Sequence, residues 1–152
     1  MTRSILRGIT TALFAGALLA PVLPAYAAEA LPTMEVFKSP YCGCCGKWVE
    51  HMQQAGFKVK VTEVDNTEAS RQRLGMPQQY ASCHTASVGN YTLEGHVPAA
   101  DVKKLLKDKP AARGLAVPGM PAGSPGMETD KPQAYDTLLI GRDGKSSVFA
   151  RH

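Results

Sequence analysis

Three of the four cysteines lie within four consecutive positions of the chain. Cys42 and Cys45 have the spacing of a CxxC motif, and Cys44 adds a third thiol between them. The fourth cysteine, Cys83, is followed directly by His84. An ordinary core does not require so many thiols in so short a stretch, so the pattern indicates either soft-metal binding or thiol redox chemistry.

The cysteine cluster precedes a segment with the apolar spacing of a helix, in which Trp48, Val49, Met52 and Ala55 recur on one face. Unpaired backbone N–H groups and the helix dipole favour negative charge at a helix start, so these thiols should be more acidic than free cysteine. Thiolate is both a nucleophile for disulfide exchange and a soft metal donor. Acidity alone therefore leaves both chemistries open.

The third thiol favours metal. A dithiol oxidoreductase requires only Cys42 as nucleophile and Cys45 as resolving thiol, and Cys44 would be able to trap wrong disulfides. A four-cysteine zinc site usually has two CxxC pairs, whereas this chain offers one cluster and the single Cys83. Cu(I) accepts two or three thiolates and allows a sulfur to bridge two metals, so a crowded set suits a multinuclear copper cluster.

Two other uses of the cysteines are less favoured. Two structural disulfides would leave the second bridge closing only a very short loop, with little entropic return. An iron–sulfur cluster is disfavoured by the export that we predict from the N-terminus, described below.

Among the histidines, His84 is the best candidate for an accessory ligand, because it adjoins a cysteine. His51 lies two helical turns beyond the cluster, so we expect it at the surface of the helix end or as a cap. His96, just before a predicted helix, is expected to pack or cap, and His152 is expected to be a mobile terminal residue.

Residues 110–132 contain five prolines and four glycines together with Met120 and Met127. The segment is too broken for a regular element, and we expect an ordered cover. Its two thioethers are candidate accessory copper donors, although methionine in such a segment more often fills a core.

Hydrophobic periodicity and turn residues predict the elements that must position these groups. The cysteine cluster falls between a short buried strand and the first helix, and Cys83 falls in a polar loop. We expect strands at 34–37, 57–64 and 91–94, helices at 45–55, from 65 or 66 to 74 and from 98 to about 109, and a hairpin of 135–140 and 146–150 around Asp143-Gly144.

This order predicts an α/β, thioredoxin-like fold: a central mixed sheet with flanking helices and a C-terminal β-hairpin, with CxxC where the first strand meets the first helix. The Cys83 loop and the Pro/Gly/Met segment are expected as insertions in that arrangement.

The first 27 residues are expected to be a cleaved signal peptide. Arg3 and Arg7 precede a short apolar run, and Ala25-Tyr26-Ala27 fits a cleavage site. Residues 28–152 are then a single exported, periplasmic domain without stable membrane insertion. This mature part has 15 Lys and Arg against 13 Asp and Glu, a formal charge of +2 that gives no support for a nucleic-acid partner. Hydrolase motifs such as GxSxG and HExxH are absent from the sequence.

Three motifs in order resemble the CopG-type family of bacterial periplasmic copper-resistance proteins: CGCCGKW at 42–48, SCHTASVGNYTLEGHVPA at 82–99 and RGLAVPGMPAGSPGME at 113–128. The resemblance covers nearly all of residues 28–152. It implies a thioredoxin-like fold and a role in copper detoxification, with redox interconversion of copper as one form of that role. It also implies a copper site built by the four cysteines, Cys42, Cys44, Cys45 and Cys83.

The leading hypothesis is a periplasmic copper-binding protein in which four thiolates hold more than one Cu(I). The alternative is a thiol-disulfide oxidoreductase that uses Cys42 and Cys45, and a third hypothesis is copper oxidoreduction with an electron-transfer partner. Expected partners are copper ions and a periplasmic copper donor, acceptor or electron carrier.

Overall fold

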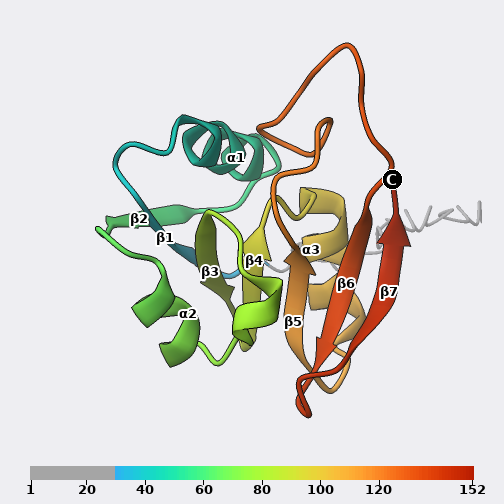
Figure 1. Ribbon diagram of the computed structural model, residues 1–152. Coiled ribbons are helices and arrows are strands. Elements are labelled where there is room, and N and C mark those ends of the chain that lie inside the picture. The colour runs from blue at the N-terminus through green and yellow to red at the C-terminus, as the bar shows by residue number, and fades with distance from the viewer. Residues whose placement is uncertain (1–29) are drawn as a thin grey trace, which may run out of the picture.

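The computed structural model describes residues 30–152, and the predicted signal peptide lies outside the described residues. The described chain has an α/β fold with one mixed sheet of seven strands, three α-helices and a C-terminal hairpin (Figure 1). The strand order is β2-β1-β3-β4-β5-β6-β7. The elements are β1 (Met34–Lys38), α1 (Gly43–Gln54), β2 (Val59–Glu63), α2 (Glu68–Arg73), the 3-10 helix η1 (Gln78–Tyr80), β3 (His84–Val88), β4 (Tyr91–Gly95), α3 (Ala99–Asp108), β5 (Ala112–Val117), β6 (Asp136–Gly141) and β7 (Ser146–Arg151).

The pairing of β1 decides where the cysteines meet. β1 runs parallel to β2 and antiparallel to β3, and its last residue, Lys38, pairs with His84, the first residue of β3. The loop that follows β1 leads into α1, and the residue before β3 is Cys83. The two cysteine segments therefore lie at the same end of the sheet, one after β1 and the other before β3. Cys45 and Cys83 are 38 residues apart in the sequence.

Helices α1 and α3 share the main core with one face of the sheet. Helical spacing places Trp48 and Met52 of α1 and Val102 and Leu105 of α3 on the buried side. The fully or nearly fully buried residues of this core are Met34, Val36, Trp48, Val49, Met52, Phe57, Ala86, Val88, Leu93, Val97, Ala99, Val102, Leu105, Leu115 and Val117.

A smaller cluster forms away from this core, where Met76 and Tyr80 pack with Ala116 and Ile140. In β5, Ala116 alternates with Leu115 of the main core, so the two clusters use opposite faces of the strand. The sheet is therefore covered on both sides.

Two strands were not expected from the sequence. Cys83 lies outside the strands, but the polar loop predicted around it ends there, because residues 84–88 form β3, an inner strand between β1 and β4. The prediction was wrong because His84, Thr85 and Ser87 give this strand a polar composition, although His84 and Thr85 are fully buried.

β5 corrects the second prediction, that 110–132 has no regular element. Residues 112–117 pair in parallel with β4 and antiparallel with β6. Only the following stretch, 118–135, lacks helix and strand, and Figure 1 shows it passing beside α1 on its way to β6. We call this stretch the cover segment.

The C-terminal hairpin is confirmed, with β6 and β7 paired around a turn that contains Gly144 at a φ of 81°. His152, predicted to be mobile, is instead held in place. Its Nε2 lies 2.9 Å from Oδ2 of Asp101, and its ring stacks on Tyr135 with centroids 4.8 Å apart. The prediction failed because the pairing that ends the hairpin extends to the last residue through backbone bonds with Tyr135.

Candidate metal centre

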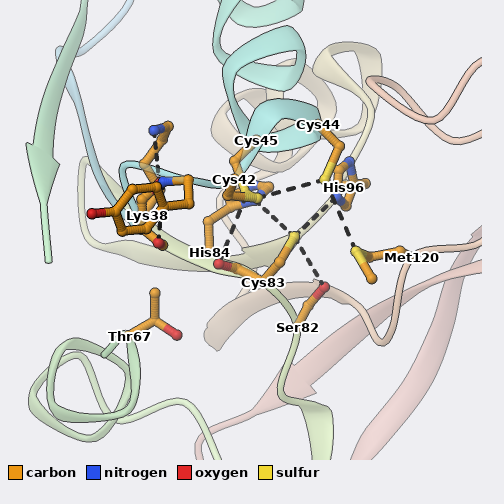
Figure 2. The surroundings of a disulfide bond; sticks show 12 residues. Lys38, Cys42, Cys44, Cys45, Thr67, Ser82, Cys83, His84, His96 and Met120 are labelled. Atoms are coloured by element: carbon orange, nitrogen blue, oxygen red, sulfur yellow. Dashed lines mark hydrogen bonds between the residues drawn. A yellow bond between two sulfur atoms is a disulfide. The ribbon is translucent and has the colours of Figure 1, made fainter. Parts of the chain in front are cut away.

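The structure brings all four cysteines together at the start of α1 (Figure 2). Cys42 is the N-cap residue of α1, Cys44 and Cys45 lie in its first turn, and Cys83 faces them from the start of β3. The four sulfur atoms lie within 4.8 Å of one another. This spacing allows one ion, or a small cluster with bridging sulfurs, to be bound by four thiolates.

Cys42 and Cys45 form a disulfide with a Cα–Cα distance of 5.3 Å, whereas Cys44 and Cys83 are free. The free Cys44 sulfur lies 3.5 Å from that of Cys42. The structure therefore shows an oxidised CxxC pair beside two thiols. Four thiolate ligands become available only after the disulfide takes up two electrons, since thiolate is the donor form.

His96, which the sequence predicts to pack or cap, lies beside the cysteines and is a further candidate ligand. Its Nε2 lies 3.1 Å from the Cys83 sulfur, and its Nδ1 lies 2.7 Å from the backbone oxygen of Pro125. Because a carbonyl only accepts, Nδ1 carries the proton in the neutral ring and the lone pair of Nε2 points to the sulfur. A carbonyl that fixes the far nitrogen in this way is typical of histidine metal ligands.

A sequence signal for His96 did exist. Gly89-Asn90 separates two runs that become β3 and β4, and their register pairs Thr85 with Glu94. A residue just beyond Glu94 must then lie near one just before Thr85. The prediction failed because the first of the two strands was interpreted as a loop.

His84 lies at the centre of the same site and is fully buried. Its Nδ1 is 3.5 Å from the Cys83 sulfur, and its ring packs against Trp48 at 4.3 Å between centroids. Nε2 has no hydrogen-bond partner within the described residues. Burial, with a smaller contribution from His96, lowers the pKa of His84 to about 3, so the imidazole is neutral and able to donate a lone pair.

Burial has the opposite effect on the thiol. Burial first, and the neighbouring Cys44 second, raise the pKa of Cys83 to about 11. For His96, burial lowers the pKa, so the residue is an uncharged base. Without metal, Cys83 is therefore a thiol that donates to His96, and metal binding must release its proton.

The two candidate methionines have different positions. The Met120 sulfur lies 4.0 Å from that of Cys44, and the side chain is half exposed at the edge of the site (Figure 2). Met127 lies in a turn of the cover segment, where its backbone forms hydrogen bonds with the backbones of Ser124 and Gly123. None of the sulfur contacts found within residues 30–152 joins its thioether to a cysteine.

The cover segment lies directly against the start of α1. At Gly126, with a φ of 88°, an added Cβ would lie 2.6 Å from the backbone oxygen of Cys44 and 3.0 Å from the backbone nitrogen of Trp48. Only glycine allows this approach. A second contact joins the hydroxyl of Ser82 to the backbone oxygen of Gly119. At Gly119 and Gly126 the cover segment thus lies against the residues that surround the cysteines.

A groove of about 420 Å³ reaches the site from the side of α2. Cys83 and Met120 line it, together with polar residues of the 66–82 region, among them Gln78 and Ser82. Two of the soft donors are therefore reached from this groove. Among residues 30–152, no helix has the length and apolar character needed to cross a bilayer.

The fold and its donor groups define an α/β protein with a four-cysteine site able to bind metal. Two solved structures, "Copper resistance protein copG- Form 1" and "Form 2", are 41% identical to the chain, with TM-scores of 0.75 and 0.76. Each alignment covers 80% of this chain and 98% of the other. Residues 80–127 also match the family described as "Protein of unknown function, DUF411". The chain belongs to the CopG family of copper resistance proteins. No curated protein sequence matches it.

Proposed function

We propose that this protein binds Cu(I) through the thiolates of Cys42, Cys44, Cys45 and Cys83, as a thiolate-bridged cluster of more than one ion, and thereby contributes to copper resistance. The observation that carries the proposal is the convergence of four sulfurs within 4.8 Å. The solved relatives, described as copper resistance proteins, support copper as the metal. Soft, closely spaced sulfurs are the ligands that select Cu(I) over harder ions.

The proposal extends to the scaffold. In the strand order β2-β1-β3-β4, with β1 and β2 parallel and β3 antiparallel to its neighbours, a CxxC motif follows β1. We take this part as a thioredoxin-like unit, with β5, the cover segment and the β6–β7 hairpin added to it. The cover segment then contributes Met120 to the site, and the residue that follows β4 contributes His96.

Three further side chains suit accessory roles. His96 and His84 present nitrogens 3.1 and 3.5 Å from the Cys83 sulfur, and the Met120 thioether lies beside Cys44. Both imidazoles have lowered pKa values because they are buried, so protons do not compete for their lone pairs near neutral pH. A cluster at this site would therefore be held by three sulfurs on the α1 side, and by the Cys83 sulfur with the two imidazole nitrogens on the β3–β4 side.

Loading requires reduction. The Cys42–Cys45 disulfide takes two electrons and two protons from a dithiol reductant, which becomes a disulfide, and the resulting thiols release protons as they bind copper. The oxidised protein keeps only Cys44 and Cys83 as thiol donors. The disulfide state and the fully loaded state thus exclude each other.

An anaerobic Cu(I) titration of residues 28–152 tests the proposal. The reduced protein should saturate at more than one copper per chain, and the protein with the disulfide intact, run as the control, should bind less. A reduced protein that binds one zinc per chain in preference to copper would contradict the copper assignment. Ultraviolet absorption of the copper–thiolate bonds provides the readout.

The observed disulfide favours one second function, thiol-disulfide oxidoreduction with Cys42 as nucleophile and Cys45 as resolving thiol. Insulin reduction that survives the double change Cys44→Ser and Cys83→Ser would support it, because only the CxxC pair would then be needed. Loss of that activity would instead favour the copper site. Copper oxidoreduction with an electron-transfer partner would use the same sulfurs and would appear as turnover between Cu(I) and Cu(II).

We also propose a periplasmic location, with residues 1–27 removed as a signal peptide and 28–152 acting as one domain. The sequence features described above support this location. Cell fractionation followed by N-terminal sequencing of the purified protein tests it. The expected first residue is Ala28, and an intact N-terminus in the cytoplasmic fraction would contradict the proposal.

A further inference from the structure

A buried ion pair lies beside the segment that carries Cys83. Arg71 of α2 and Glu94 of β4 have side chains that are 4% and 0% exposed, and Nε of Arg71 lies 3.0 Å from Oε1 of Glu94. Buried ion pairs add little net stability compared with apolar residues of the same size. Net stability therefore does not explain why Arg71 and Glu94 are buried together here.

Arg71 and Glu94 both form hydrogen bonds with the backbone of Ser82, the residue before Cys83. The Ser82 N–H donates to Oε1 of Glu94 at 2.7 Å, and Nη2 of Arg71 donates to the Ser82 carbonyl at 2.9 Å. That carbonyl belongs to the peptide bond that joins Ser82 to Cys83. One ion pair thus satisfies both backbone groups of the residue immediately before the fourth cysteine.

The pair is itself held in a single geometry. The Thr85 hydroxyl donates to Oε2 of Glu94 at 2.6 Å, while the Arg71 guanidinium also donates to Gln78 at 3.2 Å and to Thr67 at 3.1 Å. A planar guanidinium with several fixed acceptors restricts orientation more than a lysine ammonium does. The backbone of Ser82 is therefore hydrogen-bonded to an ion pair whose own orientation is fixed.

A glycine at the end of β4 allows Ser82 to approach this strand closely. Gly95, with a φ of 71°, follows Glu94, and an added Cβ there would lie 2.7 Å from the Cβ of Ser82. The next residue, His96, contacts the Cys83 sulfur. At the end of β4, Glu94 thus fixes the backbone before Cys83 and Gly95 allows Ser82 to approach closely. His96, the next residue, contacts the Cys83 thiol.

We infer that Arg71 and Glu94 are positioning residues that hold the Cys83 sulfur within 4.8 Å of the sulfurs of Cys42, Cys44 and Cys45. They act through the Ser82 peptide and touch no sulfur. The inference rests on the proposed copper site for its purpose, but its geometric content, the closeness of Cys83 to Cys44, is measurable without copper.

The test uses the Cys42→Ser/Cys45→Ser form of residues 28–152, in which Cys44 and Cys83 are the two remaining thiols. In a buffer of reduced and oxidised glutathione, the two thiols lose two protons and two electrons to form a disulfide, and one oxidised glutathione becomes two reduced molecules. The equilibrium gives the effective concentration of one thiol at the other, which falls steeply when the geometry loosens. Mass spectrometry after alkylation measures it.

Arg71→Lys should lower this effective concentration at least about tenfold. Arg73→Lys is the matched control, since Arg73 is an exposed arginine of the same helix that lies over Phe37 and makes no contact with Ser82. Thr137→Val controls for stability, because it removes a buried hydrogen bond to Asp101 that is separate from the cysteines. Neither control should change the effective concentration.

Glu94→Gln provides a second variant of nearly the same shape. Its amide oxygen can still accept from Arg71 and Ser82, but loss of the carboxylate charge weakens both hydrogen bonds. The variant should therefore also lower the effective concentration, and faster hydrogen exchange of the Ser82 amide should accompany the loss. Unchanged values in a folded Arg71→Lys or Glu94→Gln protein would overturn the inference. Failure of both variants to fold would likewise overturn it, because the pair would then support the fold as a whole.

Copper binding adds a separate readout. If the wild-type protein binds Cu(I), Arg71→Lys should weaken binding and alter the copper–thiolate absorption, while Arg73→Lys should do neither. If the wild type binds no copper, the proposed function fails. The thiol equilibrium still decides whether Arg71 and Glu94 position Cys83.

Discussion

The Cys83 sulfur and Nε2 of His96 lie 3.1 Å apart, and the opposite nitrogen of the same ring is fixed by the Pro125 carbonyl. This chain of contacts joins the start of β3, the residue that follows β4 and the cover segment. A change in any of the three should therefore be detectable at the sulfur.

Replacing His96 with glutamine should weaken Cu(I) binding by about 10- to 100-fold, because the site loses a neutral imidazole aimed at the Cys83 thiol. Competition with a Cu(I) chelator under anaerobic conditions measures the change. His51→Gln is the matched control, as His51 bonds the backbone of Ala99 instead of a sulfur. Equal affinities for the two variants would remove His96 from the site.

Met120→Leu should lower Cu(I) affinity a few-fold, since its thioether is 4.0 Å from the Cys44 sulfur, and Met127→Leu should leave it unchanged. The two substitutions are chemically identical and lie in the same cover segment, so a difference between them reports the location of the sulfur. The same chelator competition applies. A larger effect at Met127 would show that the cover segment rearranges when copper binds.

Gly126→Ala should destabilise the protein more than Gly119→Ala does, by at least about 1 kcal/mol. Both glycines have positive φ, 88° and 70°, so both alanines carry the strain of the left-handed region, about 1–2 kcal/mol. Only at Gly126 does the new Cβ also meet backbone, including the Cys44 oxygen at 2.6 Å, whereas nothing lies within 4 Å at Gly119. Urea unfolding compares the two, and equal losses would contradict the close approach of the cover segment to α1.

The hydrogen bond between α1 and α3 should make stability depend on pH. The Ala99 N–H donates to Nε2 of His51 at 3.1 Å, which requires an unprotonated nitrogen. Burial lowers the pKa of His51, with the Glu128 carboxylate acting in the opposite direction. Because the folded pKa lies below the ordinary value of 6.5, this contribution to stability is complete above that pH and is lost as the pH falls through the folded value.

His51→Gln removes the titration and keeps an acceptor. The difference in unfolding free energy between wild type and variant should therefore shift against the wild type between pH 7 and pH 5. Urea unfolding of the copper-free protein at both pH values measures it. A difference that does not change with pH would show that His51 has the same pKa in the folded and the unfolded protein, and that its bond to Ala99 does not support the fold.

Local patterns predicted the parts of the fold that short-range chemistry decides. The helical spacing of Trp48 and Met52 and the Asp143-Gly144 turn each need only neighbours in sequence. α1 and the β6–β7 hairpin accordingly lie where they were expected. β3 and β5 were missed because an inner strand is covered on both faces, so its residues need not alternate in polarity.

The same division holds for the site. Cys42, Cys44 and Cys45 share a helix start, so their proximity follows from the sequence alone. Whether Cys83 joins them depends on the pairing of Lys38 with His84 across β1 and β3, which no local signal encodes. His96 was predicted to pack or cap because the β3–β4 pairing that places it beside Cys83 was not recognised in the sequence.

The sequence by itself thus determined the donor chemistry: a crowded set of thiols at a helix start, with one further cysteine and a soft, thioether-bearing segment elsewhere in the chain. Only the tertiary structure decided which donors meet, because strand register and the buried Arg71–Glu94 pair set the position of Cys83, and the cover segment sets that of His96 and Met120. Residue type is local, whereas the distance between donors depends on contacts between segments far apart in the chain.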